Sequence, residues 1–407
     1  MSLPLAGLKV LDTTAYISGP YASALLASMG AEVVKVEPPS GDAFRRGAGI
    51  SSKYFCQYNA GKKSIVVDLK SPEGVALIKS MVPHFDVFME NSRPGKMAAM
   101  GLGREALVAI NPQLVYSSVS GFGDGGPFRD RAAYDSIGQS MSGFYSIMND
   151  AGNARLSGTC LADLITALVS TTGILAALAG RGIGAPAASR MVETSLLEAM
   201  SAVTIDAVAQ FFDDGGVSPT RSSRHPQAQN FCLLCEDGGS ITLHLSSSQK
   251  FWQALCKAMD QPELAERPEF ATYNDRDRNY WKLKPQIEAA FVQRPRAEWE
   301  ALLAAADVPF APVLTVGENL AHPQSQWLEL LEPEADGQSL VRPPWRFGGA
   351  RPTRPVQAPD VGAQTRDVLQ AFLPAERIDA LLAAGVVRDL AWTPAQAPAK
   401  ASASETV

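Results

Sequence analysis

Residues 8–37 read LKVLDTTAYISGPYASALLASMGAEVVKVE, and this stretch decides the fold class. A short apolar strand at 8–14 precedes a helix at 19–30, which Gly30 ends, and a second apolar strand follows at 31–37. Strands joined by such a helix run parallel, because a parallel pair needs a long crossover connection. The stretch therefore predicts a βαβ unit of an α/β layer with helices on both faces of the sheet.

The same alternation of strands and helices continues to about residue 122. Its further elements are a strand at 64–70, a helix at 71–82 capped by Ser71, a strand at 85–91, a helix at 103–110 and a strand at 114–122. Alternation this regular predicts an open, mostly parallel, Rossmann-like sheet. Residues 134–213 are apolar and mostly helical in pattern, with an interruption near 181–193.

The length of the chain and the changes of composition along it predict two domains. Its 407 residues exceed one ordinary hydrophobic core, and the Gly, Pro, Ser and Arg residues at 215–229 are typical of a boundary or exposed loop. We therefore expect the N-terminal part of a large α/β domain at 1–213, a smaller α+β domain at 214–325, a further segment at 326–392 and a disordered, low-complexity tail at 393–407.

Composition and charge argue against several classes of protein. The chain is 46% hydrophobic and 19% charged, which is typical of a globular protein rather than a disordered one. A net charge of -6 gives no support for binding to nucleic acid or to a membrane surface. Residues 1–12 lack the charged and apolar regions of a secretory signal, so we expect a soluble, cytoplasmic protein.

Residues 161–180 form the most apolar long stretch of the sequence, and they are numerous enough to span a bilayer. The stretch nevertheless carries Asp163 and several hydroxyl groups, and it lacks aromatic or basic flanks. We therefore expect a buried helix of a globular core.

The cysteine and histidine patterns give no support for a metal site. Five cysteines without an export signal indicate reduced thiols. Cys232 and Cys235 form one CxxC pair in a segment with the pattern of a strand, whereas a structural zinc site needs four ligands. No second CxxC or HxxxH completes such a site, so we expect no bound metal.

Residues 121–126, GFGDGG, match the dinucleotide fingerprint GxGxxG and follow a predicted strand. Pro127 comes next, however, and the following residues open no amphipathic helix whose N-terminus would hold a pyrophosphate. The first βα turn, where this fingerprint normally lies, reads YISGP instead. Glu37, at the end of the second strand, is the one match for a ribose-binding acid. We therefore do not expect a nicotinamide enzyme.

Asp163 stands out because it lies in the first turn of an otherwise apolar helix, which Ser157 or Thr159 is placed to cap. A carboxylate there is expensive to bury unless the helix-terminal amides and the helix dipole hold its charge. One interpretation is an aspartate that helps the helix to begin. The other is a carboxylate nucleophile that the same amides hold ionised. The position alone does not decide between them.

Seven segments of the chain share the order and spacing of a known family over about residues 5–390. They are VLDTTAYISGPYASALLASMGAEVVKVEPPSGDAFR at 10–45, SIVVDLKSPEG at 64–74, MENSRPGKMAAMGLG at 89–103, INPQLVYSSVSGFGDGGP at 110–127, AYDSIGQSMSG at 133–143, LADLITALVSTTGILAAL at 161–178 and DGGSITLHLSSSQKFWQALC at 237–256. Together they resemble the class III coenzyme A transferases, the carnitine and bile-acid CoA-transferase family that includes formyl-CoA transferase.

The resemblance implies an architecture. Family members form interlocked homodimers, with the site between the large domain of one subunit and the small domain of the other, and in the large α/β sheet we expect coenzyme A (CoA) at the carboxyl ends of the strands, near the turn at Gly19. The smaller domain follows, and the C-terminal segment then returns to the large domain. On this basis we expect a homodimer whose large domain binds CoA.

The resemblance also implies a mechanism. The Asp163 carboxylate attacks a donor CoA thioester and forms a mixed anhydride, and then an aspartyl-CoA thioester from which the acceptor acid takes over the CoA. The CoA thioester is thus a substrate, and no permanently bound cofactor is expected.

The residues of this chain match the CoA-binding positions of the family less evenly. Lys70 and Arg93 suit phosphates, although both also fit an ordinary surface lysine and loop arginine. Tyr134 is placed to line the acyl pocket or to pack in the core. The full predicted set is Tyr16, Ile17, Arg45, Val67, Lys70, Asn91, Arg93, Met100 and Tyr134.

The substrates are predicted only as classes. Succinyl-CoA is a common donor in the family, and Arg45, Arg46 and Arg93 are placed to meet a second carboxylate of the acid. Ile17 and the segment LSSSQ at 245–249 depart from formyl-CoA transferase, which argues against oxalate and formyl substrates.

Two alternatives stay open. Related α-methylacyl-CoA racemases carry a His-Asp dipeptide where this chain has Tyr134 and Asp135, so one partner of a two-base proton exchange is missing. A non-catalytic CoA-binding protein would bind CoA without a covalent intermediate. CoA transfer through Asp163 is the function we expect, with an acyl-CoA and a carboxylic acid as small-molecule partners.

Overall fold

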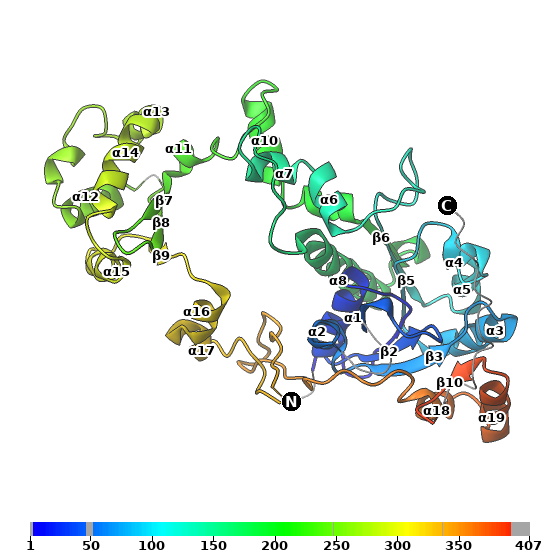
Figure 1. Ribbon diagram of the computed structural model, residues 1–407. Coiled ribbons are helices and arrows are strands. Elements are labelled where there is room, and N and C mark those ends of the chain that lie inside the picture. Colours follow the sequence, from blue (N-terminus) through cyan, green and yellow to red (C-terminus); the bar gives the residue numbers. More distant parts are fainter. Residues whose placement is uncertain (1–2, 46–51, 247, 336, 392–407) are drawn as a thin grey trace, which may run out of the picture. The chain divides into compact units, whose positions relative to one another are not determined.

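The computed structural model describes residues 3–45, 52–246, 248–335 and 337–391. Within them the chain folds into two compact units (Figure 1). The larger unit takes Met1–Phe144, Leu156–Ile205 and Glu329–Val407, and the smaller one takes Tyr145–Arg155 and Asp206–Leu328. The smaller unit thus begins before the expected boundary at residue 214 and includes a segment of the expected large domain. The tail expected at 393–407 lies outside the described residues.

The larger unit contains a seven-stranded sheet with the order β10-β3-β2-β1-β4-β5-β6. Six strands run parallel, and β10 pairs with β3 in the antiparallel direction. The expected mostly parallel α/β sheet is therefore confirmed, and the C-terminal segment supplies its last strand. The strands are β1 Lys9–Asp12, β2 Glu32–Glu37, β3 Lys63–Val67, β4 Val87–Glu90, β5 Val115–Ser120, β6 Met191–Ser195 and β10 Val387–Arg388.

Strand β6 corrects the expectation of a mere interruption near 181–193. It runs parallel to β5, with Met191 opposite Tyr116. Strand β6 is the last in the strand order of the sheet, and only its Thr194 and Ser195 are buried, so it shows neither a buried apolar run nor a clear alternation. Those are the signals by which strands are recognised in a sequence, which explains why the strand was missed.

Helices cover both faces of the large sheet. Alternate strand residues point to opposite faces, so Val10 and Val87 pack with α1 and α8, whereas Leu11 and Phe88 pack with α3, α5, α18 and α19. The helices that belong wholly to this unit are α1 Ser18–Ser28, α2 Lys53–Asn59, α3 Pro72–Met81, α4 Lys96–Ala99, α5 Arg104–Ile110, α6 Asp135–Met141, α8 Leu161–Gly182, α9 Leu196–Ser201, α18 Thr365–Leu369 and α19 Ala375–Ala383.

Helix α8 is the helix expected from the apolar stretch at 161–180. By length and composition alone it is the one helix of the described residues that is suited to cross a membrane. In the larger unit, Ala167 and Ile174 of α8 lie in the core beneath the sheet. The Thr171 hydroxyl donates a hydrogen bond of 3.3 Å to the Ala22 carbonyl of α1. These contacts are those of a core helix.

The smaller unit contains an antiparallel sheet of β7 Asn230–Leu234, β8 Ser240–His244 and β9 Phe310–Pro312. Trp252, Phe291 and Trp299 are buried in its core. Cys232 on β7 is exposed and Cys235 is buried, and all five cysteines are free thiols. No group of three metal-ligating side chains occurs in the described parts of the chain. The remaining helices are α7 Phe144–Met148, α10 Ile205–Asp213, α11 His225–Ala228, α12 Gln249–Ala258, α13 Tyr273–Arg278, α14 Tyr280–Phe291, α15 Arg296–Ala305, α16 Val316–Ala321 and α17 Pro323–Trp327.

The strand order of the large sheet marks a place for a ligand. β1 lies between β2 and β4, so the chain reverses its direction of travel across the sheet at this point. Open α/β sheets bind ligands outside the carboxyl ends of their strands at such a switch point. The loops that follow β1 and β4 are therefore the first place to look for a site.

Candidate active site

The loop between β1 and α1, residues 13–17, is held in place by the end of β4. Asn91 Oδ1 accepts a hydrogen bond of 2.9 Å from the Ala15 amide, and Asn91 Nδ2 donates one of 2.8 Å to the Ala15 carbonyl. Tyr16 has a φ of 65°, which is uncommon for a residue with a side chain. Such a conformation persists only where its surroundings enforce it, so this loop is a fixed wall.

Six charged side chains, none more than 5% exposed, lie buried near this loop. Lys35 Nζ donates a 2.8 Å hydrogen bond to the Thr14 carbonyl and lies 2.8 Å from Asp42 Oδ2. Buried charges are tolerated when they are paired and hydrogen-bonded. The three cations and three anions balance, and they are Asp12, Lys35, Glu37, Asp42, Arg45 and Lys62.

Arg45 belongs to this buried network, which corrects its predicted role. Its Nε and Nη2 atoms donate to the two carboxylate oxygens of Glu37, each at 2.7 Å. Its guanidinium carbon lies 3.9 Å from the centroid of the Phe55 ring. With 2% of its surface exposed, Arg45 is held at the end of β2 by the carboxylate of Glu37. Arg46 lies outside the described residues.

Gly19 allows α1 to approach the same loop closely. A Cβ atom at this position would lie 2.4 Å from the Cβ of Thr14. Thr14 cannot yield easily, because its hydroxyl and its amide both donate to Asp12 Oδ1, at 2.5 and 2.9 Å. Glycine is therefore required at the first turn of α1.

Asp163 lies in the first turn of α8, and Asp135 caps this turn from another helix. The Asp163 amide donates a hydrogen bond of 3.2 Å to Asp135 Oδ1. Asp135 is the first residue of α6, and Gln139, one turn later, donates through Nε2 to Asp135 Oδ2 at 2.5 Å. A carboxylate near the positive end of a helix dipole is favourable. Two helices are thus joined through their first turns.

The expected capping of α8 by Ser157 or Thr159 is wrong. The N-cap is Cys160, whose side chain accepts no capping hydrogen bond. The Ser157 hydroxyl donates instead to Gln139 Oε1 at 2.6 Å, and the Thr159 carbonyl accepts from Gln139 Nε2 at 3.1 Å. Both residues therefore orient the side chain that holds Asp135.

Burial raises the pKa of the Asp163 carboxyl group to about 7, and the negative charge of Asp135 acts in the same direction. A hydrogen bond with the Ser18 side chain acts in the opposite direction. The position at the helix terminus therefore does not keep the pKa of Asp163 at its ordinary value of 3.8. A carboxyl group that titrates near neutral pH beside a cavity is typical of a functional site.

Asp163 lines a cavity of about 240 Å³ at the switch point of the large sheet. The loops after β1, β4 and β5 form its walls together with the first turn of α8. The rings of Tyr16 and Tyr134 stand edge to face, with their centroids 5.9 Å apart. The lining residues are Tyr16, Ser18, Asn91, Ser92, Arg93, Pro94, Val119, Ser120, Gly121, Arg131, Ala132, Ala133, Tyr134, Asp163 and Leu196.

Four predicted CoA-binding residues line the cavity beside Asp163, namely Tyr16, Asn91, Arg93 and Tyr134. Tyr134 is 63% exposed, so it belongs to the cavity wall and not to the core. Asn91 uses both ends of its amide group on Ala15, which gives it a supporting role in the loop. The cavity therefore gathers residues that lie far apart in the sequence.

The other predicted CoA-binding residues lie elsewhere. Val67, the last residue of β3, is fully buried in the core. Ile17 is the N-cap of α1, Lys70 is exposed, and Met100 packs partly against the core. Together with Arg45, these residues do not line the cavity that contains Asp163.

Three residues of the site were absent from the predicted set. Ser18 is 6% exposed and lies against Asp163, Arg131 lines the cavity, and Asp135 caps α8. The position of Asp135 beside Tyr134, in a segment that the family resemblance already covered, was the one available signal. The sequence of the loop that carries Arg131 has no periodic pattern, so the path of this loop could not be predicted.

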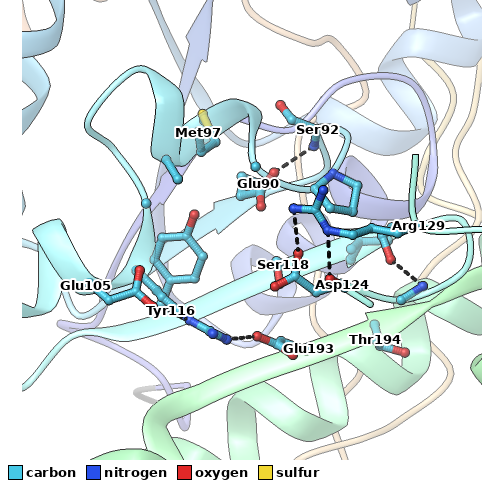
Figure 2. A pocket seen from close by; sticks show the side chains of 18 of the residues that line it. Glu90, Ser92, Met97, Glu105, Tyr116, Ser118, Asp124, Arg129, Glu193 and Thr194 are labelled. Carbon is cyan, nitrogen blue, oxygen red and sulfur yellow. Dashed lines mark hydrogen bonds and ion pairs between the residues drawn. The ribbon is translucent and has the colours of Figure 1, made fainter. Parts of the chain in front are cut away.

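A second cavity of about 200 Å³ adjoins the first at the ends of β4, β5 and β6 (Figure 2). Its arginines are already engaged. Arg129 donates to the Asp124 carbonyl and to Asp130 Oδ1, each at 2.9 Å, and Arg104 pairs with Glu193. The two cavities share Ser92, Pro94, Val119 and Ser120.

Glu90, at the end of β4, lies in the wall of this second cavity. Figure 2 shows its carboxylate bonded to the Ser92 amide, at 2.6 Å. Burial raises the pKa of Glu90 to about 7, and the charge of Asp124 adds to this effect, although the hydrogen bond from Ser92 opposes it. The second cavity is thus lined by acidic residues, and its arginines form ion pairs with nearby carboxylates.

The GxGxxG segment at 121–126 forms a turn without a helix behind it. Gly123 and Gly126 have φ angles of 97° and 79°, and the next helix, α6, begins only at Asp135. The expectation that the residues after Pro127 do not directly open a helix is confirmed. No helix N-terminus follows these glycines directly, as a dinucleotide fingerprint requires.

Sequence comparison identifies relatives along most of the chain. The family model for CoA-transferase family III matches residues 5–365. Human succinyl-CoA:glutarate CoA-transferase is 30% identical over 401 residues, which cover 94% of this chain and 90% of that protein. Acetyl-CoA:oxalate CoA-transferase of Acetobacter aceti is 35% identical over 331 residues, which cover 79% and 84% of the two chains.

Solved structures agree with this assignment. A CAIB/BAIF family protein from Brucella suis has a TM-score of 0.79 at 30% identity, covering 92% of this chain and 100% of that chain. Rv3272 from Mycobacterium tuberculosis has a TM-score of 0.80 at 27% identity, covering 91% and 99%. With the α/β fold and the matched segments, these similarities show that the chain belongs to CoA-transferase family III and is a CoA-transferase.

Proposed function

We propose that this CoA-transferase moves CoA from succinyl-CoA to a carboxylic acid through a covalent intermediate on Asp163. The observation that carries the proposal is a half-buried carboxyl group at the start of α8, which lines a cavity at the switch point of the large sheet. Relatives named for succinyl-CoA, including human succinyl-CoA:glutarate CoA-transferase and succinyl-CoA–D-citramalate CoA-transferase of Chloroflexus aurantiacus, support the choice of donor.

The chemistry consists of four exchanges at carbonyl carbons. The Asp163 carboxylate attacks the donor thioester, the C–S bond breaks, and CoA thiolate leaves a mixed anhydride. The thiolate then attacks the aspartyl carbonyl of the anhydride and releases the donor acid. The acceptor carboxylate attacks the resulting aspartyl thioester and again releases thiolate. The thiolate finally attacks the acceptor carbonyl, which restores the Asp163 carboxylate. No proton is consumed overall.

Neighbouring groups in the cavity fit this sequence of steps. Asp135 fixes the first turn of α8 through the Asp163 amide, and Ser18 bonds the carboxyl group itself. Ser18 is also the first residue of α1, and the first amides of a helix lack partners within that helix. These amides are suitable donors to the oxygen that gains negative charge at each tetrahedral step.

Mass spectrometry after a hydroxylamine quench tests the intermediate. We expect a hydroxamate on the peptide that contains Asp163 after incubation with succinyl-CoA, and none in the Asp163→Ala variant, which should still bind CoA. Normal turnover by Asp163→Ala would overturn the proposal. Deuterium exchange from solvent into the α-carbon of an acyl-CoA would point to the racemase chemistry instead, because CoA transfer breaks no C–H bond.

We also propose that the protein is a cytoplasmic homodimer. The support is the likeness to the class III CoA-transferases over most of the chain, whose members form interlocked pairs. Light scattering of the purified protein tests the assembly, and a monomeric mass at micromolar concentration would contradict it.

A further inference from the structure

Two arginines line the cavity that contains Asp163. Arg93 follows β4, and Arg131 lies in the loop between β5 and α6. Asp163 is the one acidic side chain among the lining residues of this cavity. Each guanidinium group offers N–H donors in a planar fork, which matches a carboxylate in two parallel hydrogen bonds. The wall beside the reactive carboxyl group is therefore suited to an anionic ligand.

These two arginines differ from those of the adjoining cavity. Neither Arg93 nor Arg131 forms an ion pair with another residue of the described part of the chain, whereas Arg104 and Arg129 both pair with carboxylates. Acids thus neutralise the arginines of the second cavity, whereas the two arginines around Asp163 have no carboxylate partner among the described residues. A ligand that enters beside Asp163 meets this positive charge.

Arg131 is also oriented before any ligand binds. Its guanidinium carbon lies 4.2 Å from the centroid of the Phe128 ring, and its backbone amide donates to the Phe128 carbonyl at 2.9 Å. A cation stacked on an aromatic ring loses part of its rotational freedom in advance. Less conformational entropy is then lost when an anion binds.

We infer that Arg131, together with Arg93, binds the second carboxylate of a dicarboxylic acid whose first carboxylate reacts at Asp163. The inference rests on the proposed CoA transfer and names its acceptor class. The reacting carboxylate alternates between a charged acid and a neutral thioester, whereas the second carboxylate keeps its charge throughout. A fixed guanidinium group can therefore hold the free acid and its CoA thioester in the same place.

The size of the cavity favours a short acid over a larger one, and the shape of CoA argues against one of its phosphates at this position. The cavity of about 240 Å³ is smaller than the roughly 300–1,000 Å³ of sites for drug-sized ligands. The phosphates of CoA are separated from its sulfur by the whole pantetheine arm. A group that lies beside the reacting carboxyl is thus nearer to the acyl part than to the phosphates.

The test compares two five-carbon acids that differ in one carboxylate. The KM of glutarate is measured with succinyl-CoA as donor, and pentanoate is measured either as acceptor or as a competitive inhibitor of glutarate. Arg131→Met is the test variant, and Arg129→Met, two positions away in the same loop and already paired with Asp130, is the matched control. Arg131→Lys keeps the charge but loses the fork. Calorimetry gives the Kd of free CoA for every variant.

We expect Arg131→Met to raise the KM of glutarate by about 10- to 100-fold, since hydrogen bonds to charged groups contribute about 1.5–3 kcal/mol. The constant for pentanoate and the Kd of CoA should stay unchanged, Arg131→Lys should recover part of the loss, and Arg129→Met should behave like the wild type. The KM of succinyl-CoA should rise too, because its free carboxylate occupies the same position.

Two results would overturn the inference. Equal effects on glutarate and pentanoate would show that the second carboxylate is not recognised. A weaker affinity for free CoA in Arg131→Met would assign the arginine to a CoA phosphate. In either case the Asp163 hydroxamate of the wild type would still form, so a failure of this inference differs from a failure of the proposed function, in which no hydroxamate forms at all.

Discussion

The amide of Asp163 donates a hydrogen bond of 3.2 Å to Asp135 Oδ1, so that one aspartate caps the helix that carries the other. The charge of Asp135 therefore adds to burial in raising the pKa of Asp163 to about 7. Only the ionised form of Asp163 attacks a thioester. We thus expect kcat/KM for succinyl-CoA to fall about tenfold per pH unit below this pKa.

Asp135→Asn removes the charge of Asp135 and the hydrogen bond from Gln139, while the amide oxygen can still accept the capping hydrogen bond from the Asp163 amide. We expect the acid limb of the kcat/KM profile to move to lower pH, since the carboxyl group of Asp163 loses a nearby negative charge. Asp130→Asn removes an exposed carboxylate that pairs with Arg129 and should leave the limb in place. An unchanged limb in Asp135→Asn would show that burial alone sets the pKa of Asp163.

The raised pKa of Asp163 also predicts a change in stability. The pKa is about 7 in the folded protein and ordinarily 3.8, so the folded state binds this proton more tightly. The stabilising effect is fully present below pH 3.8 and is lost as the pH rises towards 7. The side chain of Asp163→Asn carries no charge at any pH. At pH 8 the free energy of unfolding of this variant should therefore exceed that of the wild type by on the order of 1–3 kcal/mol, and its unfolding temperature should be higher.

Thermal unfolding of Asp163→Asn and the wild type at pH 4 and pH 8 checks this expectation. The advantage of the variant should shrink as the pH falls from 8 to 4, because the wild-type carboxyl group then becomes neutral too. An advantage of equal size at both pH values would have to come from a cause other than the ionisation of Asp163.

Lys62 and Lys63 are neighbours that differ in burial. Lys62 Nζ is fully buried and donates to Asp12 Oδ2 at 3.0 Å and to the Pro20 carbonyl at 2.9 Å. Lys63 lies 3.2 Å from Glu32, and both of these side chains are nearly half exposed. Lys62→Met leaves Asp12 buried without this partner, so we expect a loss of about 3–5 kcal/mol in the free energy of unfolding.

Lys63→Met is the control, and it should change the free energy of unfolding by less than about 1 kcal/mol because its ion pair is exposed. Urea denaturation of both variants gives the comparison directly. Similar losses for the two lysines would mean that burial of the Lys62 pair contributes nothing beyond an ordinary surface interaction.

Gly19→Ala should disturb the wall of the active site. The new methyl group would lie 2.4 Å from the Cβ of Thr14, and overpacking of this kind costs about 1–3 kcal/mol. Because the shift reaches the Tyr16 loop, turnover should also fall by at least about tenfold. In Gly182→Ala, by contrast, the Cβ meets no atom within 4 Å, so turnover should be unchanged. Wild-type turnover in Gly19→Ala would show that the loop adapts.

Elements that depend on local chemistry could be predicted from the sequence. The Ser71 hydroxyl accepts hydrogen bonds from the Glu73 and Gly74 amides at 3.2 and 3.4 Å, as expected for a cap of the helix that follows. The first βαβ unit and the long apolar helix α8 also have clear periodic patterns. Strand β6 has none, because it lies at the edge of the sheet and is mostly polar.

Tyr16, Asn91, Arg93 and Tyr134, which line the cavity, were predicted from the family resemblance, whereas only Asp163 stands out by its own position. Asp163 does so because a carboxylate is unusual in an apolar helix. Arg45 and Arg131 show the opposite case, since the two side chains are chemically identical and only the fold decides their roles. Arg45 meets the buried carboxylate of Glu37, whereas Arg131 lies in the wall of the cavity. The path of the chain between distant segments decides such contacts, and no local pattern encodes that path.

Strand β10 pairs with β3 through Val387 and Val67, and about 320 residues, including the whole smaller unit, separate these two positions. At a synthesis rate of roughly 5–20 residues per second, the ribosome needs about 16–64 s to make them. Throughout that time the outer edge of β3 has no neighbouring strand, and such an edge can pair with other chains. A nascent chain of this protein is thus most exposed to aggregation before its final residues emerge, and chaperone binding to nascent chains should persist until β10 has been made.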